Sequence, residues 1–303
     1  MDWWLVLAQL LPKRKLTDEQ FAIILVIPLI LALLALNIYP MVYSFWLSLT
    51  NTDISRGISK FIGFINYYNL MFKDPYFKHS LRVSLQFTLE ASLLAVALSL
   101  AFALILNESF KGRRVIRTMA ILPWAFSTYA VASLARYLFA RSYGLFSSLY
   151  VYLGLSDTPI EIVTTESAIH ILALLFAWNY VPLGAFFLLA QLQIIPLDLY
   201  NQARIDGASA IRRFRVVTLP FLRRPIAIIL LLFTVFSVVE TTLIIGFTGG
   251  GPGRATQALT YWAYAKTFMD YEYGYGAAIS WFLILIAMAL GVLYYYVLNK
   301  LKL

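Results

Sequence analysis

IIPLDLYNQARIDGASAIRRFRVVTLPFLRRP, residues 194–225, is a polar and basic stretch between two long apolar runs. Pro196 suits the first turn of a helix, and Asp198 places a carboxylate near the positive end of the helix dipole. These features predict a short helix that continues to about Ile205. Asp206-Gly207 should interrupt this helix, because glycine accepts the left-handed cap conformation that other residues avoid.

A second short helix should follow the glycine. Ile211, Phe214 and Thr218 fall at i, i+3 and i+7, which predicts one stripe on a helix, and arginines flank this stripe at positions 212, 213 and 215. Such a helix can bind a protein partner, or it can lie on a surface of anionic lipid. Charge and amphipathicity fit both alternatives.

Composition places the chain among membrane proteins with several spans. It has 303 residues, of which 61% are hydrophobic and 13% charged, and its mean hydropathy is +0.77. No segment between apolar runs exceeds about 35 residues, which is too short for a usual soluble domain. The net charge is +9, but the basic residues lie at predicted membrane edges, which argues against a nucleic-acid partner.

Six apolar runs are long enough to cross a membrane, since a span needs about 20 residues. They lie near 21–49, 82–106, 117–139, 167–194, 225–247 and 277–298. Most of the 24 lysine and arginine residues fall in one set of intervening segments, which the positive-inside rule assigns to the cytoplasm. We therefore predict an all-α membrane protein in which both termini, Arg212 and Arg213 are cytoplasmic and Arg254 is external. Met1–Leu11 is too short to span, and we interpret it as an interfacial stub.

The basic stretch resembles the cytoplasmic EAA loop of permease subunits in binding-protein-dependent ABC importers. That loop reads roughly Tyr-Glu-Ala-Ala, three residues, Gly, nine residues, Ile, one residue, Leu-Pro. The matching residues are Tyr200, Ala203, Asp206, Gly207, Ala208, Leu219 and Pro220. Asn201 and Gln202 stand where Glu and the first Ala are usual, and Val217 replaces the Ile. The resemblance implies that these loop residues couple to an ATPase, and that the small Ala203, Gly207 and Ala208 permit its close approach.

Further fragments are similar to sugar-type permeases and follow the same order as in that family. They are Phe61–Phe77, Leu122-Pro123-Trp124, Tyr143-Gly144-Leu145, Gln193–Pro196, Thr248–Pro252 and Tyr273–Ala278. Each fragment alone is ordinary turn chemistry, but their joint order points to the carbohydrate-uptake branch and its maltose-type first permease. The resemblance implies a type I ABC importer fold in a prokaryotic cytoplasmic membrane.

The implied layout has a cytoplasmic segment with the stub (1–20), a first span with an outer segment (21–77), and a type-1 transmembrane domain (78–299) with a coupling loop (195–224). The implied partners are a second permease in a heterodimer, two cytoplasmic ATP-binding subunits, an extracytoplasmic sugar-binding protein, the sugar and membrane lipid. ATP and Mg²⁺ would bind to the partner ATPase, with no cofactor in this chain.

Polar residues in spans are expensive and are therefore functional candidates. They are Gln86, Glu90, His170, Asn179, Gln191, Ser237 and Glu240. For Gln86, Glu90 and His170 we favour hydrogen bonds between packed helices. The resemblance, carried over by the spacing from Trp178 to Pro182 and from Leu219-Pro220, implies a substrate pathway at Asn179, Tyr180, Leu183, Ser237 and Glu240. Hydroxyl partners and an aromatic face suit a sugar.

The sequence shows no catalytic machinery. A phosphate-binding Gly-x-x-x-x-Gly-Lys-Ser/Thr loop is absent, so the chain is not the ATPase, and we predict no enzyme activity. His79 and His170 lie in no metal-ligand spacing. The main alternative is an ion-coupled secondary transporter of a small polar solute that uses Glu90 or Glu240 as its titrating carboxylate. A membrane structural or assembly subunit is a third class.

Overall fold

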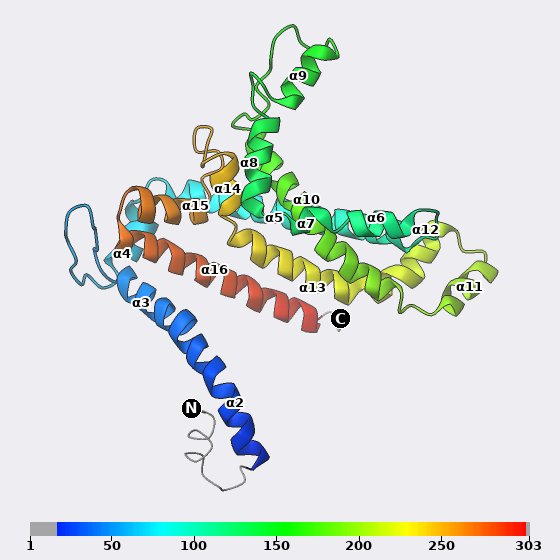
Figure 1. Ribbon diagram of the computed structural model, residues 1–303, viewed down its shortest axis with the longest axis horizontal. Coiled ribbons are helices and arrows are strands. Elements are labelled where there is room, and N and C mark those ends of the chain that lie inside the picture. Colours follow the sequence, from blue (N-terminus) through cyan, green and yellow to red (C-terminus); the bar gives the residue numbers. More distant parts are fainter. Residues whose placement is uncertain (1–16, 301–303) are drawn as a thin grey trace, which may run out of the picture. The chain divides into compact units, whose positions relative to one another are not determined.

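The computed structural model describes residues 17–300, so the predicted stub at Met1–Leu11 lies outside the described residues. The chain divides into residues 1–47 and residues 48–303, here called unit 1 and unit 2. The described residues are helical apart from loops and isolated β-bridges, which confirms the all-α prediction (Figure 1).

Unit 1 consists of the helical run of the first span. Its elements are α2 (Asp18–Leu33), the π-helical turn η1 (Leu34–Ile38) and the beginning of α3 (Tyr39–Ser48). Thr17 begins α2 with a capping box, in which its side chain accepts a hydrogen bond from the Gln20 backbone and the Gln20 side chain accepts one from Thr17. None of the α2 side chains is buried, as expected of a helix that meets lipid.

Unit 2 holds the other spans and the segments that join them. Its helices, in order, are α4 (Ile65–Tyr68), η2 (Asn69–Lys73), α5 (Phe77–Asn107), α6 (Arg113–Met119), α7 (Leu122–Ala125), α8 (Thr128–Leu138), α9 (Leu145–Tyr152), α10 (Ala168–Leu192), α11 (Leu197–Ile205), α12 (Ala210–Arg213), η3 (Phe214–Thr218), α13 (Leu219–Val238), α14 (Thr242–Phe247), α15 (Leu259–Tyr264), η4 (Ala265–Met269) and α16 (Tyr273–Lys300).

The core of unit 2 forms where α5, α10 and α13 pack together (Figure 1). Phe87 and Phe176 meet edge to face with ring centroids 6.0 Å apart, and both are fully buried with Phe233. Gly184 lets α10 approach α5 closely, because a Cβ at this position would overlap the Ser99 side chain. Small residues at such crossings are how helices pack in a membrane, where burial in lipid gives little drive to associate.

Five helical segments are long and apolar enough to span, and they correspond to five of the six predicted runs. The third predicted span, 117–139, is wrong as a single helix. It is a pair, Arg113–Ala125 and Thr128–Leu138, bent by 93°. The backbone at Phe126 and Ser127 leaves the helical region, with ψ of 140° and 134°, and this accounts for the break. Average hydropathy does not register this bend, because both arms are apolar.

The fifth predicted span, 225–247, is also interrupted. Helix α13 ends at Val238 and α14 begins at Thr242, so Glu240 lies in the break and not inside a helix. Its Oε1 accepts a hydrogen bond of 2.9 Å from the Leu243 backbone N–H in the first turn of α14. A carboxylate that satisfies a free N–H at a helix start stabilises this break.

Candidate functional site

Loop 195–224 begins with α11, which ends in the glycine cap that the sequence predicts. Gly207 has a φ of +71°. The Gly207 N–H donates to the Arg204 carbonyl at 3.0 Å, and the Ala208 N–H donates to the Ala203 carbonyl at 2.9 Å. These two bonds form a Schellman motif, in which Gly207 must adopt the left-handed conformation. The predicted break at Gly207 is confirmed.

The predicted second short helix does not stand alone. After Ser209 caps the Arg212 N–H at 3.3 Å, the chain is helical from Ala210 to Val238, so the predicted helix forms the first turns of the fifth span. Pro220 does not end it, because the preceding turn η3 is widened and the Leu219 N–H bonds the Phe214 carbonyl. A proline interrupts a regular helix through its lost N–H and its clash with the carbonyl four residues back, and a π-helical turn accommodates both.

The residues predicted for ATPase coupling divide into two groups by burial. Tyr200 ties the loop together, since its hydroxyl lies 2.9 Å from the Thr218 Oγ1 across the hairpin. Ala203 and Ala208 are each only 8% exposed. The expectation that these alanines permit a partner to approach is therefore wrong, because they pack against their own chain. The remaining members are half-buried Leu219 and five exposed residues, Asn201, Gln202, Asp206, Gly207 and Pro220.

Large apolar side chains project from this polar loop, and the sequence analysis did not single them out as exposed. Ile205 is 86% exposed, Leu197 76% and Ile211 67%. The sequence does indicate their exposure, because these apolar residues lie on both sides of the predicted cap in a segment that is too polar to enter a membrane. Exposed apolar residues gathered on one polar loop indicate a protein contact surface.

The residues predicted for the substrate pathway use most of their polar atoms inside the chain. Asn179 is 3% exposed, and its Nδ2 donates to the Pro123 carbonyl at 2.7 Å, which holds the bent α7 segment against α10. Ser237 is 2% exposed and donates to the Thr234 carbonyl at 3.0 Å. Glu240 is 7% exposed and caps α14. Glu240 shares no helical face with Ser237, because α13 ends at Val238 between them.

Tyr180 and Glu240 do lie close together, although they come from separate elements. The Tyr180 ring packs on Phe176 and Phe236 with centroids 4.4 Å and 5.5 Å away, and its hydroxyl lies near enough to Glu240 for an electrostatic interaction. Leu183 is half-buried one turn further along α10. The predicted set is thus partly assembled around Tyr180, and substrate contact by these residues stays a prediction.

Glu90 and His170 join two helices, and Gln86 supports Glu90 from within its own helix. The Gln86 Nε2 donates to one Glu90 oxygen at 2.9 Å, and the His170 Nδ1 lies 2.7 Å from the other. Glu90 is on α5 and His170 is on α10, so the pair fastens the two core helices. The contact between Glu90 and His170 confirms hydrogen bonding between packed spans for these two residues, whereas Gln86 bonds Glu90 within α5.

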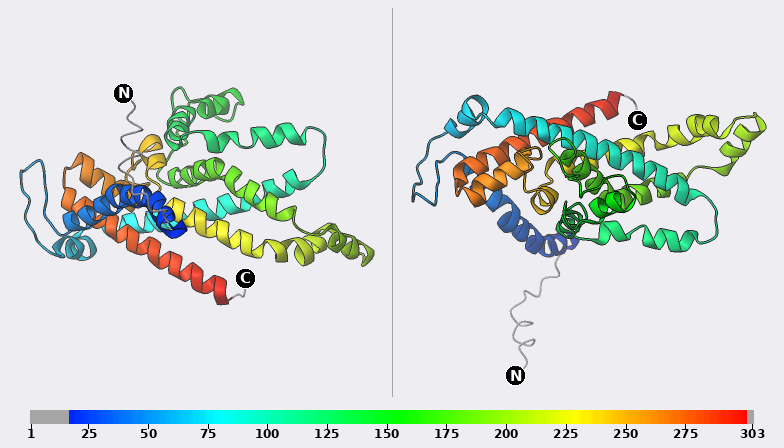
Figure 2. Two further views of the ribbon diagram at one scale, coloured as in Figure 1. Left: turned by 60° about the horizontal axis from the view of Figure 1, so that its bottom comes forward. Right: turned by 90° about the horizontal axis from the view of Figure 1, so that it is seen from above.

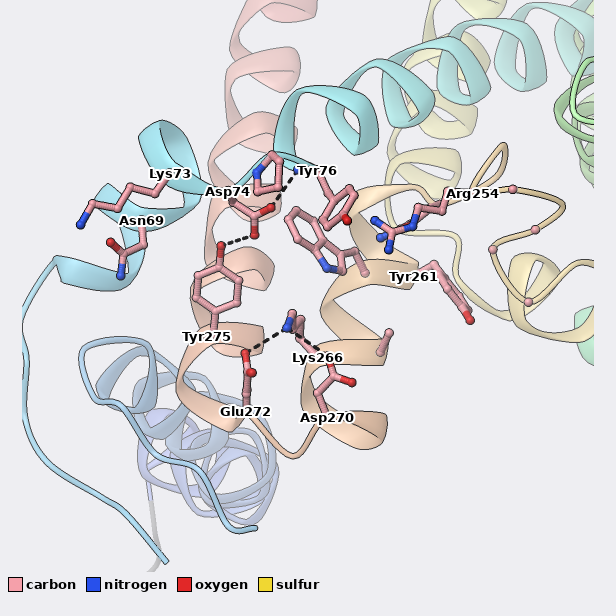
Figure 3. A pocket seen from close by; sticks show the side chains of 18 residues that line it. Asn69, Lys73, Asp74, Tyr76, Arg254, Tyr261, Lys266, Asp270, Glu272 and Tyr275 are labelled. Atoms are coloured by element: carbon pink, nitrogen blue, oxygen red, sulfur yellow. Dashed lines mark hydrogen bonds and ion pairs between the residues drawn. The ribbon is translucent and has the colours of Figure 1, made fainter. Parts of the chain in front are cut away.

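A cavity of about 870 Å³ opens between η2, the glycine-rich segment 249–253, α15, η4 and the start of α16 (Figure 3). The Arg254 guanidinium stacks over the Tyr76 ring at 3.5 Å from its centroid, and the Arg254 carbonyl lies 2.8 Å from the His79 Nε2. Asp74 accepts hydrogen bonds from the Tyr275 hydroxyl at 2.6 Å and from the Tyr76 N–H at 2.9 Å. The Arg254 contacts hold the glycine-rich segment beside the beginning of α5.

Lys266 forms ion pairs with two carboxylates on the opposite wall, where its Nζ lies 3.0 Å from Asp270 and 3.1 Å from Glu272 (Figure 3). Partial burial alone would lower the pKa of the Lys266 amine, but the hydrogen bonds to the two carboxylates outweigh it and hold this pKa above its ordinary value. Aromatic faces beside carboxylates are suited to hydroxyl-rich ligands. No motif in the sequence predicts this cavity, because its lining residues come from segments that lie far apart in the chain.

The sequence of this chain is similar to those of known transport proteins. Residues 94–302 match the family described as binding-protein-dependent transport system inner membrane component. The trehalose/maltose transport system permease protein MalF of Thermococcus litoralis is 33% identical over 283 residues, which cover 93% of this chain and 95% of that protein. The sulfoquinovosyl glycerol transport system permease protein SmoG of Agrobacterium fabrum is 29% identical and covers 92% and 90%.

Among solved structures, a chain of a bacterial alginate ABC transporter has the same fold. That structure is a complex with an alginate pentasaccharide-bound periplasmic protein, and its chain aligns with a TM-score of 0.78 at 20% identity. The alignment covers 98% of this chain and 95% of that chain. At this identity the match establishes the fold.

Proposed function

The chain belongs to the family of binding-protein-dependent transport system inner membrane components, and from this premise we propose that it is the permease subunit of an ATP-driven importer of a sugar or oligosaccharide. A relative named for trehalose and maltose transport aligns over nearly the whole chain, and another is named for a sulfoquinovosyl glycerol. The spans form the pathway, and ATP is hydrolysed on partner subunits.

The observation that carries the proposed mechanism is the continuous helix from Ala210 to Val238. It has 29 residues. At about 1.5 Å per residue it extends roughly 40 Å from loop 195–224 into the core of unit 2. The Tyr200–Thr218 hydrogen bond joins α11 to the same helix. A push on α11 is therefore transmitted directly to α13, which packs on α5 and α10. ATP-driven closure of the partners would switch the pathway between outward and inward access.

Loop 195–224 supplies the surface that an ATP-binding partner subunit would contact. Its exposed residues combine apolar Ile205 with the polar Asn201, Gln202 and Asp206, next to the rigid Schellman cap. We place the ATP-binding subunit here, one per permease, with a second permease completing the pathway and an extracytoplasmic binding protein delivering the sugar. Both termini of this chain are then cytoplasmic, as the basic residues predict.

The two carboxylates that the ion-coupled alternative requires both have hydrogen-bond partners within the chain. Glu240 is buried and capped onto α14, and Glu90 is held between Gln86 and His170.

Cross-linking tests the proposed coupling surface. The sequence has no cysteine, so Ile205→Cys introduces a single thiol on the exposed end of α11. A short thiol-reactive photo-cross-linker on this residue should capture the ATP-binding subunit that co-purifies with the complex. The matched control is Phe268→Cys in η4, a 58% exposed apolar position beside the outer cavity, which should capture none of it. Equal capture from both positions would contradict the proposal.

A further inference from the structure

A second cavity, of about 500 Å³, lies against α6 and has three arginines in its wall. Arg113, Arg114 and Arg117 line it together with Thr118, Ile121 and Phe186. Figures 1 and 2 show α6 at the same end of unit 2 as the hairpin of α11 and α12, so this cavity lies at the membrane edge that carries loop 195–224. Here it is called the α6 cavity.

The arginines of the α6 cavity have no anionic partner in the part of the chain that the structure describes. Arg113 Nε and an Arg117 amino group both donate to the Leu106 carbonyl, each at 2.9 Å. The two cationic groups therefore lie no further apart than twice that distance, and like charges at this range repel. None of the ion pairs between residues 17 and 300 includes Arg113, Arg114 or Arg117.

A buried donor in the same cluster is also unsatisfied. The Arg117 Nε is buried and has no hydrogen-bond partner. A buried donor without an acceptor is destabilising. Attraction of basic residues to the cytoplasmic side explains exposed arginines at a membrane edge, but it gives no reason to bury an arginine N–H among other arginines. An anion bound by these arginines would offset their positive charge and relieve the repulsion between them.

The shape of the cavity indicates which anion. The arginines occupy the first turns of α6, whereas Ile121 follows α6 and Phe186 is an apolar residue of α10. The wall thus changes from cationic to apolar along its length, as a glycerophospholipid does from its phosphate to its acyl chains. Guanidinium groups suit phosphate oxygens, which they can bind through two parallel hydrogen bonds. Basic pockets between spans at the cytoplasmic side are known to bind lipid headgroups.

We propose that the α6 cavity binds an anionic phospholipid, with its phosphate on Arg113, Arg114 and Arg117 and the beginning of its acyl chains along Ile121 and Phe186. The lipid would fasten the end of α5 to α6 and brace α6 against α10 at Phe186, at the base of the bent third span. This role is independent of which solute the importer carries.

The test measures lipid retention on the purified full complex by native mass spectrometry. The probes are a phosphatidylglycerol, a phosphatidylcholine of the same acyl chains, and inorganic phosphate. The informative variant is Arg114→Gln, because Arg114 is exposed and does not share the Leu106 carbonyl, so α5 keeps its cap. The matched control is Arg224→Gln, another exposed arginine, which lies in the second turn of α13 and does not line the α6 cavity.

Wild type should retain phosphatidylglycerol in preference to phosphatidylcholine, and inorganic phosphate should not displace it. Arg114→Gln should weaken retention about fivefold, the effect of one basic side chain at an anionic membrane surface, while Arg224→Gln retains as wild type does. Equal weakening in both variants would show diffuse attraction and overturn the site. Displacement of phosphatidylglycerol by inorganic phosphate would mean that the cavity binds a soluble anion. Retention without a preference for phosphatidylglycerol would mean that an acidic group of a partner subunit neutralises the arginines. Either result overturns the lipid proposal.

Discussion

Substituting Gly207 tests whether loop 195–224 transmits force as one rigid hairpin. A Cβ at Gly207 would meet no atom within 4 Å, so crowding does not forbid a side chain there. The backbone does, because its φ is +71°. The left-handed conformation costs an ordinary residue about 1–2 kcal/mol, and somewhat more when the side chain is β-branched. Gly207→Val should therefore destabilise the Schellman cap by about 2 kcal/mol.

A cost of about 2 kcal/mol shifts the equilibrium between the capped and the frayed hairpin roughly 30-fold. The core of α5, α10 and α13 does not include Gly207, so the subunit should still fold and assemble. We expect Gly207→Val to lower the sugar-transport rate at least tenfold at unchanged complex yield. Gly207→Ala should be intermediate, and Gly207→Asn should transport almost normally, because asparagine tolerates the left-handed region.

The assay is initial sugar uptake by reconstituted complex, normalised to the amount of assembled subunits. Gly291→Val is the matched control, since Gly291 in α16 also has nothing within 4 Å of a Cβ but has an ordinary helical φ. It should transport as wild type does. Wild-type uptake by Gly207→Val, or the same rate for the asparagine and valine variants, would refute the reasoning from backbone strain.

Three further predictions concern topology, Glu240 and Tyr200. Single cysteines at Arg212 and Met269, both exposed, should react with an impermeant thiol reagent from opposite faces of the membrane, and labelling from one face would refute the topology. Glu240→Gln keeps an acceptor for the Leu243 N–H and should leave the melting temperature of the complex nearly unchanged. Glu240→Leu removes the acceptor and should lower the stability of the complex by about 1–3 kcal/mol. Loss of uptake in Glu240→Leu at an unchanged melting temperature would instead assign Glu240 to the pathway. Tyr200→Phe removes the hydrogen bond to Thr218 and should destabilise the hairpin by about 1 kcal/mol. Amide exchange should become faster in α11 and stay unchanged in the rest of the complex. Unaltered exchange in α11 would show that Tyr200 does not hold the hairpin together.

Local chemistry and average hydropathy account for what the sequence predicted well. Spans 82–106 and 167–194 are recognisable because a membrane helix needs a long apolar run, and the structure has helices at Phe77–Asn107 and Ala168–Ile194. The cap at Gly207 depends on one glycine and its neighbours, so four residues of sequence predict it.

The misses arise where distant residues decide the local structure. The bend in the third span is held by Asn179 on α10, which donates to the Pro123 carbonyl. Glu240 looks like a mid-span carboxylate until Leu243 is seen to donate to it. Ala203 and Ala208 look like a contact surface for a partner, but Tyr200 and Thr218 close the hairpin so that both alanines face inward. Each of these facts depends on tertiary contacts that a sequence window does not contain.

The most direct test of the central claim is initial uptake of labelled trehalose or maltose into vesicles that contain this chain with its second permease, ATP-binding subunits and sugar-binding protein. Uptake should require both the binding protein and hydrolysable ATP, and it should be unaffected when ionophores collapse the proton and sodium gradients. Uptake that persists without ATP and stops when an ion gradient collapses would contradict the account.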